Sequence, residues 1–425
     1  MFRVKVVVVK YAKVMMHWHC HGYATNANLK PFHEIPSPKG ALPFVGTLFS
    51  LMAAGGAENL HEYINERHKQ LGAVFRERLG PVTSIFLNDA DEIRKVFSLE
   101  GRYPKHVLPE CWLLYNKTYN YQRGLYFMDG TEWFKYRKIL NDVLLKRDYY
   151  AEAKKNAIFV EQAFEIWYEN SKRGQIIDLE NELYNLSLIF IMSFAFGSCF
   201  HENADVFLPR IRQLSAVVRE IFLHSVKLSV IPATLAMSLN LKIWSDFSQA
   251  VGQSVRYTTD LLNELISYKK KKEEDEDADG VVFHLMKRKI DANTLQRIVV
   301  DLIMAAGDTV RKDGLYRSYD DRGICRIRAS SLLFSFQNAY ASLWIFYLLA
   351  RHKDVQSELY ADIQQRGDTE TARPSPMIRN VIKESMRLYP VAPFIARYLP
   401  EETCVCSYRV PANVRAAGLA LNRRG

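Results

Sequence analysis

The sequence predicts a mainly α-helical protein with a small β-sheet region. Residues 149–268 have an almost continuous helical pattern, with breaks expected at 197–203 and at Pro232. Residues 291–309 repeat their apolar side chains with the period of a helix. Two β-rich pieces, 73–78 and 82–87, flank a Gly-Pro turn and predict a hairpin. With 425 residues, 48% of them hydrophobic, the chain can bury a large core in one domain or two.

The stretch 291–309 is the most informative of these helices. Asp291 or Asn293 can cap its N-terminus. Its apolar side chains follow the i, i+3, i+4 spacing of a single stripe, at Leu295, Ile298, Val299, Leu302, Ile303 and Ala306. The spacing therefore predicts an amphipathic helix.

The stripe ends in small and polar residues. Ala306 and Gly307 remove side-chain bulk, and Asp308 and Thr309 place a carboxylic acid beside a hydroxyl. Small side chains let a flat or diatomic ligand approach the helix backbone, and an acid beside an alcohol can pass protons to that ligand. The alternative is a tight helix crossing with a polar C-terminus, because a glycine late in a helix often marks only packing or a cap.

The composition does not indicate nucleic-acid binding or a cysteine metal site. There are 57 basic and 47 acidic residues, but five basic ones precede the first acid, Glu34, so the rest of the chain is only mildly basic. The six cysteines are scattered, with no CxxC pair and no metal-ligand spacing. This usage indicates a reducing compartment.

Residues 1–30 resemble a presequence for the mitochondrial matrix, because they contain no acid and lysines interrupt every apolar run. The same interruptions prevent this segment from spanning a bilayer. A wrongly placed start codon is the alternative. The longest later apolar run, 183–196, has the length of a buried core helix and is too short for a membrane span.

Two shorter motifs place pairs of side chains on one helix face. Trp133 and Arg137 are four residues apart, and both can donate hydrogen bonds to a carboxylate-bearing ligand. A surface cation–π pair, or a packed aromatic ring beside a solvated arginine, is the alternative. Glu384 and Arg387 are three residues apart and can form an ion pair, a common pattern that becomes specific only with the LYPVAPFIAR that follows it.

The segment 227–244 is apolar on more than one face. It fits three roles: core, a lid over an apolar substrate, or a loop that touches a membrane through Ile231, Leu235 and Trp244. The charged stretch 269–279 that follows is expected to be a solvated linker.

Four motifs in a fixed order resemble the cytochrome P450 family. They are GTEWFKYR, AAGDT, KESMRLYP and, after Arg397, YRVPA. Independent motifs in the family's order are hard to obtain by chance. The resemblance implies the family's mainly helical fold with a small β-sheet region, and a haem b cofactor.

The resemblance also implies roles for individual residues. The family's contacts to the haem propionates fall on Trp133, Arg137 and Arg397. The oxygen-activating groove, in which an acid and an alcohol deliver protons, falls on Ala306, Gly307, Asp308 and Thr309. The pair that locks the fold near the proximal side of the haem falls on Glu384 and Arg387.

Within the family the chain resembles the mitochondrial branch, and there the arthropod ecdysteroid 2-hydroxylases. Arg379 and Lys383 match the basic positions that receive an acidic, adrenodoxin-like ferredoxin. The branch implies an apolar, steroid-like substrate in ecdysteroid biosynthesis. It also implies a location on the matrix side of the inner mitochondrial membrane, with peripheral contact to that membrane, and no nucleic-acid partner.

The first departure from the family lies inside the central helix. After Thr309 the helical pattern stops, and it resumes only at Asn338. The codon of Val310 must begin with GT, and 332–337 can be encoded by a pyrimidine-rich tract ending in CAG, which are marks of a splice donor and acceptor. Residues 310–337 are therefore expected to be a retained intron, either real or an error of gene prediction. A genuine family-specific loop is the alternative.

The second departure is at the end of the chain. After Asn413 the family's pattern stops, so 31–413 is expected to be a partial P450 domain and 414–425 a tail outside the family, without the haem-ligating cysteine loop. Cys404 and Cys406 are the nearest thiols and are expected to be strand residues. Arg387 is expected to be a buried charge short of partners.

Two functions remain open. The first is a haem-thiolate monooxygenase that hydroxylates a steroid-like substrate between the 227–244 lid and the groove at Asp308 and Thr309. The second is a non-catalytic fragment, or the product of an erroneous gene model, with at most a binding role and no monooxygenase activity, because a P450 needs a thiolate ligand on its iron.

Overall fold

The computed structural model describes residues 29–305, 317–319, 325–327, 335–366 and 375–419. Within these ranges it leaves out residues 81, 100–102, 104–106, 123, 145–153, 176, 230, 272–279, 289 and 392. Most of the expected presequence and most of the 310–337 segment therefore lie outside the described residues.

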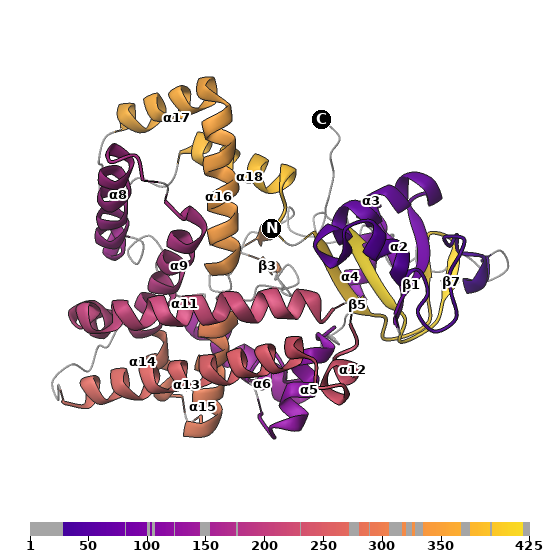
Figure 1. The fold of residues 1–425 in the computed structure, drawn as a ribbon, viewed down its shortest axis with the longest axis horizontal. Helices are drawn as coiled ribbons and strands as arrows, with labels where there is room; N and C mark the ends of the chain where they lie inside the picture. Colours follow the sequence, from indigo (N-terminus) through magenta and orange to yellow (C-terminus); the bar gives the residue numbers. More distant parts are fainter. Residues whose placement is uncertain are drawn as a thin grey trace, which may run out of the picture.

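Helices form most of the described chain, as the sequence predicts (Figure 1). The first are α2 (Leu48–Ala53), α3 (Leu60–Leu71), α4 (Ala90–Ser98), α5 (Glu110–Thr118) and α6 (Gly130–Leu144). The next are α8 (Ala157–Lys172), α9 (Leu179–Phe196), α10 (Ser198–Glu202), α11 (Ala204–Lys227), α12 (Ala233–Ser238), α13 (Lys242–Lys271) and α14 (Val281–Met286). The last are α15 (Ala292–Ala305), α16 (Ser335–Arg351), α17 (Lys353–Arg366) and α18 (Pro376–Leu388).

The helical run 149–268 is more divided than its pattern indicated. The breaks expected near Gly197 and Pro232 are present: Gly197 has a φ of 55°, and Pro232 precedes α12. A further break separates α8 from α9, where Gly174 has a φ of 71°. A glycine just after a basic last turn is a helix-end signal, so this break was readable in the sequence.

The main sheet joins the two ends of the described chain. Its strand order is β1 (Val74–Leu79), β2 (Val82–Leu87), β8 (Arg415–Leu419) and β5 (Phe394–Tyr398). β1 and β2 form the predicted antiparallel hairpin, whose turn contains Gly80 at a φ of 62°. β8 pairs parallel with β2 and antiparallel with β5. Residues 415–419, which were expected to belong to a tail outside the family, therefore lie between two strands of the sheet.

Two short antiparallel ribbons complete the β structure. β3 (Arg317–Tyr319) pairs with β4 (Cys325–Ile327) inside the segment 310–337. β6 (Thr403–Val405) pairs with β7 (Tyr408–Val410) between β5 and β8.

The sheet and the helices form two neighbouring parts of the molecule. In Figure 1 the sheet lies on the right with α2, α3 and α4, and the longer helices fill the left and centre. The largest apolar core lies among the long helices, and a second one lies where α5, α12 and α13 meet. Two smaller cores lie on the sheet.

The central helix α15 has the predicted stripe and cap. Leu295, Ile298, Val299 and Ile303 are buried in the main core, and Leu302 packs against it. Of the two candidate caps, Asp291 is the one that acts, because its Oδ1 accepts the backbone N–H of Thr294 at 2.8 Å. This interaction also lowers the pKa of the Asp291 carboxyl. Ala306, the last residue of the stripe, lies outside the described residues.

The segment 227–244 is core in part, because Leu228, Ala233, Ala236 and Trp244 are buried. Trp244, one of the three residues named for the membrane-contact alternative, is buried with 6% of its surface exposed and packs against Phe247 at a ring distance of 5.9 Å. Leu235 and Leu239 remain exposed, at 48% and 61%. The run 183–196 lies in α9 and is buried, as expected of a core helix. None of the helices that the structure describes is long and apolar enough to cross a lipid bilayer.

Candidate functional site

The residues expected to form the oxygen-activating groove follow the described end of α15 in the sequence. The helix is described to Ala305, and Ala306, Gly307, Asp308 and Thr309 fall outside the described residues. Their roles therefore stay predictions. The structure shows α15 up to Ala305 and shows that this helix is anchored in the main core.

Trp133 and Arg137 both lie on α6 and are half-buried. The indole of Trp133 packs against the main core, and α6 contacts α14. This packing holds the indole in place while part of each side chain stays accessible to a ligand. An indole N–H and a guanidinium on one helix face suit an anionic oxygen ligand.

Arg397 lies on β5 and is buried, with 2% of its surface exposed. Its Nη1 donates to the carbonyl oxygen of Ala396 at 3.0 Å, and its guanidinium lies over the ring of Phe97, 4.9 Å from the centroid. A buried guanidinium beside an aromatic face favours a carboxylate partner. A shared role of Arg397, Trp133 and Arg137 in holding the two carboxylates of a haem stays a prediction.

Glu384 and Arg387 form the predicted pair on α18. Arg387 donates through Nε to one carboxylate oxygen of Glu384 at 2.8 Å and through Nη2 to the other at 2.6 Å. The hydrogen bond to Arg387 lowers the pKa of Glu384, and its counterpart raises the pKa of Arg387. The expectation of a buried charge was wrong, because 36% of the Arg387 side chain is exposed.

The expected ferredoxin contacts lie on the exposed side of the same helix. Arg379 and Lys383 are both exposed and are four residues apart. The opposite side of α18, with Ser385 buried, is turned toward the protein, where α18 contacts α16 and α17.

The two thiols near the end of the chain differ in setting. Cys404 lies in β6, as expected of a strand residue. Cys406 instead occupies the turn between β6 and β7, where it and Ser407 have φ angles of 48° and 67°. Burial and the nearby acids Glu92 and Asp89 raise the pKa of the Cys406 thiol to about 12, so this thiol stays protonated near neutral pH.

Asp301 is a buried acid on α15 that belongs to none of the four sequence motifs. It is 3% exposed, and its Oδ2 accepts the backbone N–H of Tyr126 at 3.3 Å. Near it, Gly124 lies so close to α15 that an added Cβ would be 2.4 Å from the carbonyl oxygen of Arg297. These contacts fix the loop before α6 against α15. The signal in the sequence was an acid inside the apolar run IVVDLIM.

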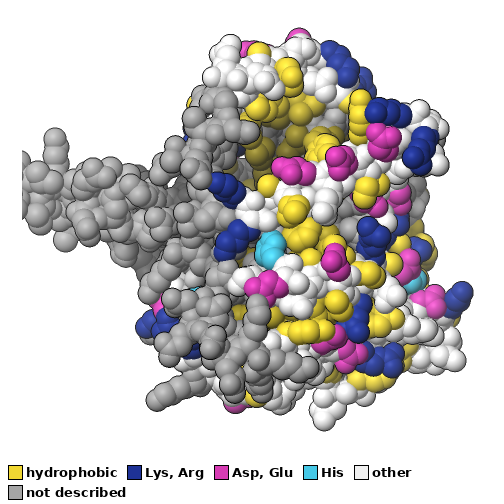
Figure 2. Space-filling view, turned by 90° about the vertical axis from the view of Figure 1, so that its left-hand side faces the viewer, with side chains coloured by type: hydrophobic (Ala, Val, Ile, Leu, Met, Phe, Trp, Pro, Cys, Tyr) yellow, Lys and Arg dark blue, Asp and Glu magenta, His cyan; other side chains and the backbone are white. Residues whose placement is uncertain are grey.

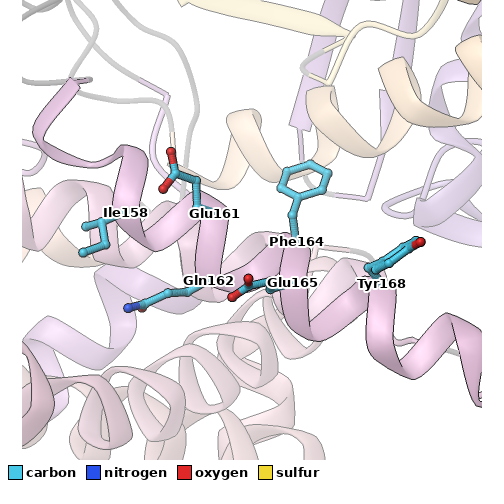
Figure 3. A pocket seen from close by; sticks show the side chains of 6 residues that line it. All are labelled: Ile158, Glu161, Gln162, Phe164, Glu165 and Tyr168. Atoms are coloured by element: carbon cyan, nitrogen blue, oxygen red, sulfur yellow. The ribbon is translucent and has the colours of Figure 1, made fainter.

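A separate hollow of about 530 Å³ lies on α8 (Figure 3). It is lined by Ile158, Glu161, Gln162, Phe164, Glu165 and Tyr168. Figure 2 shows an apolar hollow on the side of the molecule where α8 lies. None of the predicted site residues lines this hollow, so it does not belong to the candidate site.

Comparisons with known proteins agree with the motifs. The family model for cytochrome P450 matches residues 36–311 and 338–417. Mitochondrial cytochrome P450 315a1 of Drosophila melanogaster is 34% identical over 392 residues, which cover 87% of this chain and 66% of that protein.

More distant relatives lie in the same branch. The mitochondrial cholesterol side-chain cleavage enzyme of Mesocricetus auratus is 23% identical over 414 residues, covering 93% of this chain and 73% of that protein. The mitochondrial 1,25-dihydroxyvitamin D(3) 24-hydroxylase of Mus musculus is 26% identical over 405 residues, covering 91% and 71%. These names confirm the mitochondrial branch and location that the sequence predicts. This chain belongs to the cytochrome P450 family.

Proposed function

We propose that the chain is part of a haem-thiolate monooxygenase that hydroxylates an apolar, steroid-like substrate of the ecdysteroid class. The main support is the family match together with the donor set of Trp133, Arg137 and Arg397 on α6 and β5. The names of two relatives specify a sterol and a vitamin D substrate, which favours the steroid-like class. The chain spans 66% of the length of the Drosophila relative, so the activity is proposed for the longer protein.

The proposed residues have separate tasks. Trp133, Arg137 and Arg397 hold the propionates, and Asp308 and Thr309 pass protons. When bound, the haem supplies the iron chemistry by which this family inserts one atom of dioxygen into a substrate. Arg379 and Lys383 on the exposed side of α18 bind an acidic ferredoxin, the electron donor.

Residues 310–337 are proposed to be an insertion into one continuous helix. The family match is interrupted between 311 and 338. The helices before and after the gap, α15 and α16, contribute to the same core: Ile303 and Ala339 are both buried there. In the view of Figure 1 the two helices lie nearly in line, below and above α11. These observations favour a single helix that residues 310–337 divide into α15 and α16, with both halves still packed in the same core.

Peripheral membrane contact is proposed for the exposed leucines near α12. Leu235 keeps this role and Leu239 replaces Trp244, because both leucines are exposed and Trp244 is buried. Liposome flotation of the folded chain tests the contact, and a chain that remains at the bottom of the gradient would exclude it.

The second candidate function is a non-catalytic haem-binding or substrate-binding fragment. The observation that favours it is the raised pKa of Cys406, which makes the thiol a poor iron ligand. Under this alternative the 425-residue chain gives no thiolate-type carbon monoxide difference band after haem is added. A strong band from this chain would contradict the alternative.

The proposed function is tested on the product of the full-length transcript. We expect a reading frame that joins codon 309 to codon 338 and continues past residue 413 into a glycine-rich loop with a cysteine. The expressed product should show a thiolate-type carbon monoxide band and should hydroxylate a steroid when reduced ferredoxin is supplied. Asp308→Asn should lower kcat about 100-fold with unchanged haem content, and Asp260→Asn, an exposed acid on α13, should leave kcat unchanged.

A transcript that retains codons 310–337 and ends after residue 425 would contradict the proposed monooxygenase. Hydroxylation that is insensitive to Asp308→Asn would remove the proton-transfer role from that residue.

A further inference from the structure

Helix α4 covers the face of the main sheet from which Arg397 projects. Arg397 of β5 is paired with Ala416 of β8, so the two side chains lie on the same face of the sheet. Ala416 is 2% exposed and belongs to the same apolar core as Val96 of α4. The side chain of Arg397 therefore lies between the sheet and α4, which agrees with its own burial.

Three contacts fix α4 in this place. Asp89 caps its first turn and accepts hydrogen bonds from two backbone N–H groups, at 3.0 and 2.9 Å. Val96 is buried, with 4% of its surface exposed. Ile93 lies so close to Gly418 of β8 that an added Cβ would be 3.0 Å from its Cγ1. Phe97, the neighbour of Val96, is therefore presented from a helix that is anchored on the sheet.

The half-buried ring of Phe97 faces the guanidinium of Arg397. The Cζ of the guanidinium lies 4.9 Å from the ring centroid. The negative face of an aromatic ring attracts a cation, and the attraction is stronger where water is excluded. The Nη1 of the same guanidinium donates to the carbonyl oxygen of Ala396 at 3.0 Å. The ring and the carbonyl oxygen together restrict the orientation of this group.

A restricted orientation matters for an arginine that binds a carboxylate. The side chain of arginine has many rotamers, and it loses this freedom when it is held by a ligand. A side chain that is already held in the binding orientation loses less, so the ligand binds more tightly. The two parallel hydrogen bonds between a guanidinium and a carboxylate also require matching planes. A residue that orients Arg397 can therefore raise its affinity for a carboxylate without touching that ligand.

The chain that follows α4 also contacts the helix of the other two predicted propionate donors. Tyr103 packs edge-on against Phe134 of α6, with ring centroids 5.8 Å apart. Phe134 is the residue after Trp133, and Arg137 lies on the same helix. The segment that carries Phe97 is thus linked both to the strand of Arg397 and to α6.

We propose that Phe97 is a positioning residue for Arg397, and that its ring holds the guanidinium in the orientation that binds a carboxylate of the haem. The inference rests on the proposed function, in which Arg397 contacts a propionate. It goes further by naming a side chain that acts on this contact through its aromatic face. Phe97 is uncharged and belongs to none of the four sequence motifs.

The test measures how fast the product of the full-length transcript, purified with haem, releases haem to an excess of apomyoglobin. Phe97→Leu keeps an apolar side chain but removes the aromatic face, and it should speed release about tenfold, which corresponds to about 1.4 kcal/mol. Phe97→Tyr keeps the aromatic face and should leave the rate unchanged. Phe32→Leu is the matched control, because Phe32 lies 5.1 Å from the guanidinium of Arg76 in the same part of the molecule. It should not alter haem release.

Fluorinated side chains separate the charge of the ring face from its shape. Mono-, di- and trifluorinated phenylalanine at position 97 weaken the negative face step by step with little change in size. Haem release should become faster along this series. Phe97→Leu combined with Arg397→Met should release haem no faster than Arg397→Met alone, because the ring acts through the guanidinium. Urea unfolding shows whether each variant keeps the fold, and the fluorinated series does not depend on the folding of Arg397→Met.

The possible outcomes separate the inference from the proposed function. If fluorination leaves the rate unchanged, or if Phe97→Leu speeds release equally with and without the guanidinium, Phe97 acts by packing alone and the inference is wrong although the propionate contact stands. If Arg397→Met releases haem at the original rate, the propionate role of Arg397 in the proposed function fails and the inference fails with it. If the product holds no haem, both fail as well.

Discussion

The indole ring of Trp344 stacks on the phenol ring of Tyr389, with centroids 3.9 Å apart and planes 5° from parallel. Trp344 lies on α16, the first helix after the 310–337 segment, and Tyr389 follows directly after α18. The contact therefore joins the chain after the proposed insertion to the KESMRLYP motif. Both residues belong to the family segment that follows the gap, so the stack packs the first helix of that segment against its KESMRLYP motif.

This stack should contribute measurably to stability. Both rings are half-buried, and aromatic pairs in such settings contribute about 0.5–1.5 kcal/mol beyond their buried area. We expect a coupling energy of that size from urea unfolding of Trp344→Ala, Tyr389→Ala and the double variant. As a control, a double-mutant cycle of Trp344 with Tyr360, which is 64% exposed on α17, should give no coupling energy. Equal values in the two cycles would show that the stack adds nothing specific.

Deleting residues 310–337 should leave the fold intact and stabilise it. Joining Thr309 to Asn338 removes the segment between α15 and α16, so the entropy of closing the chain across that segment no longer opposes folding. We expect the free energy of unfolding to rise by on the order of 1–3 kcal/mol. Urea unfolding measures the change. A Gly-Ser segment of the same length in place of 310–337 should restore the original value, and loss of cooperative unfolding after the deletion would argue for a structural loop.

Local signals predicted the elements well. The Gly80 turn placed the β1–β2 hairpin, and the apolar stripe with Asp291 placed α15 and its cap. These features depend on neighbours within one or two turns of chain. The helix end at Gly174 was missed although its signal was equally local.

Contacts between residues far apart in the sequence determine the burial and the roles of several side chains, which local sequence patterns did not predict. Trp244 is buried because it packs with Phe247 and with residues of the distant α5. Its burial could therefore not be predicted from its own segment of sequence. Asp301 owes its role to Tyr126, which lies far away in the sequence. Arg387 was expected to be buried by analogy with the family, but its surroundings leave it partly exposed.

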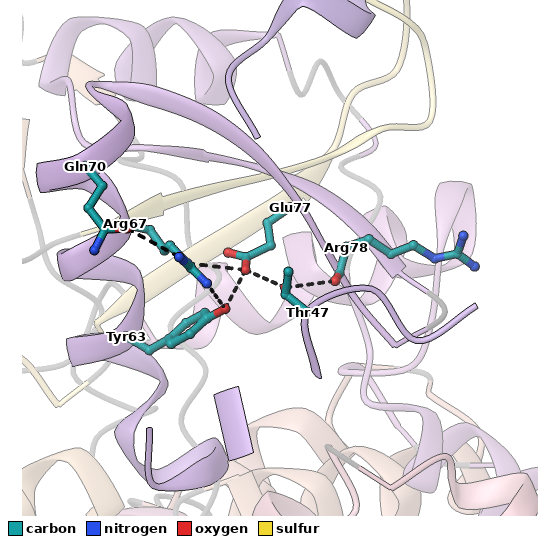
Figure 4. A network of polar contacts seen from close by, with 6 residues as sticks. All are labelled: Thr47, Tyr63, Arg67, Gln70, Glu77 and Arg78. Carbon is teal, nitrogen blue, oxygen red and sulfur yellow. Dashed lines mark hydrogen bonds and ion pairs between the residues drawn. The ribbon is translucent and has the colours of Figure 1, made fainter. Parts of the chain in front are cut away.

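Glu77 should be one of the residues most sensitive to substitution in the sheet region. Its buried Oε1 accepts from the hydroxyl of Tyr63 at 2.6 Å and from Thr47, and it lies 3.6 Å from the Nε of Arg67 (Figure 4). Glu77→Ala leaves these donors without their acceptor and should cost about 3–5 kcal/mol. Urea unfolding measures the loss. Glu66→Ala, an exposed acid on α3, should unfold at the unchanged urea concentration, and similar midpoints for both variants would contradict this role of Glu77.

His68 should make the stability of the protein sensitive to acid. It is 5% exposed, its Nδ1 contacts the carbonyl oxygen of Gly72 at 2.9 Å, and its Nε2 is buried without a hydrogen-bond partner among the described residues. Burial lowers the pKa of His68 below its ordinary value near 6.5. The unfolded chain therefore binds a proton at a higher pH than the folded protein does. The stabilising effect of keeping this ring neutral is fully present above the unfolded pKa and is lost as the pH falls through the folded pKa.

Urea unfolding above and below pH 6.5 tests this linkage. His68→Asn keeps an amide donor near the position of Nδ1 but does not titrate, so its stability should fall less on acidification than that of the unchanged protein. The ring also packs edge-on against Phe75 at 4.8 Å, so the variant loses stability at every pH and only the slope is diagnostic. His61→Asn, at a more exposed position on the same helix, should keep the original slope. If His68→Asn keeps it as well, another group causes the acid sensitivity, because a non-titrating side chain cannot reproduce a proton-linked loss.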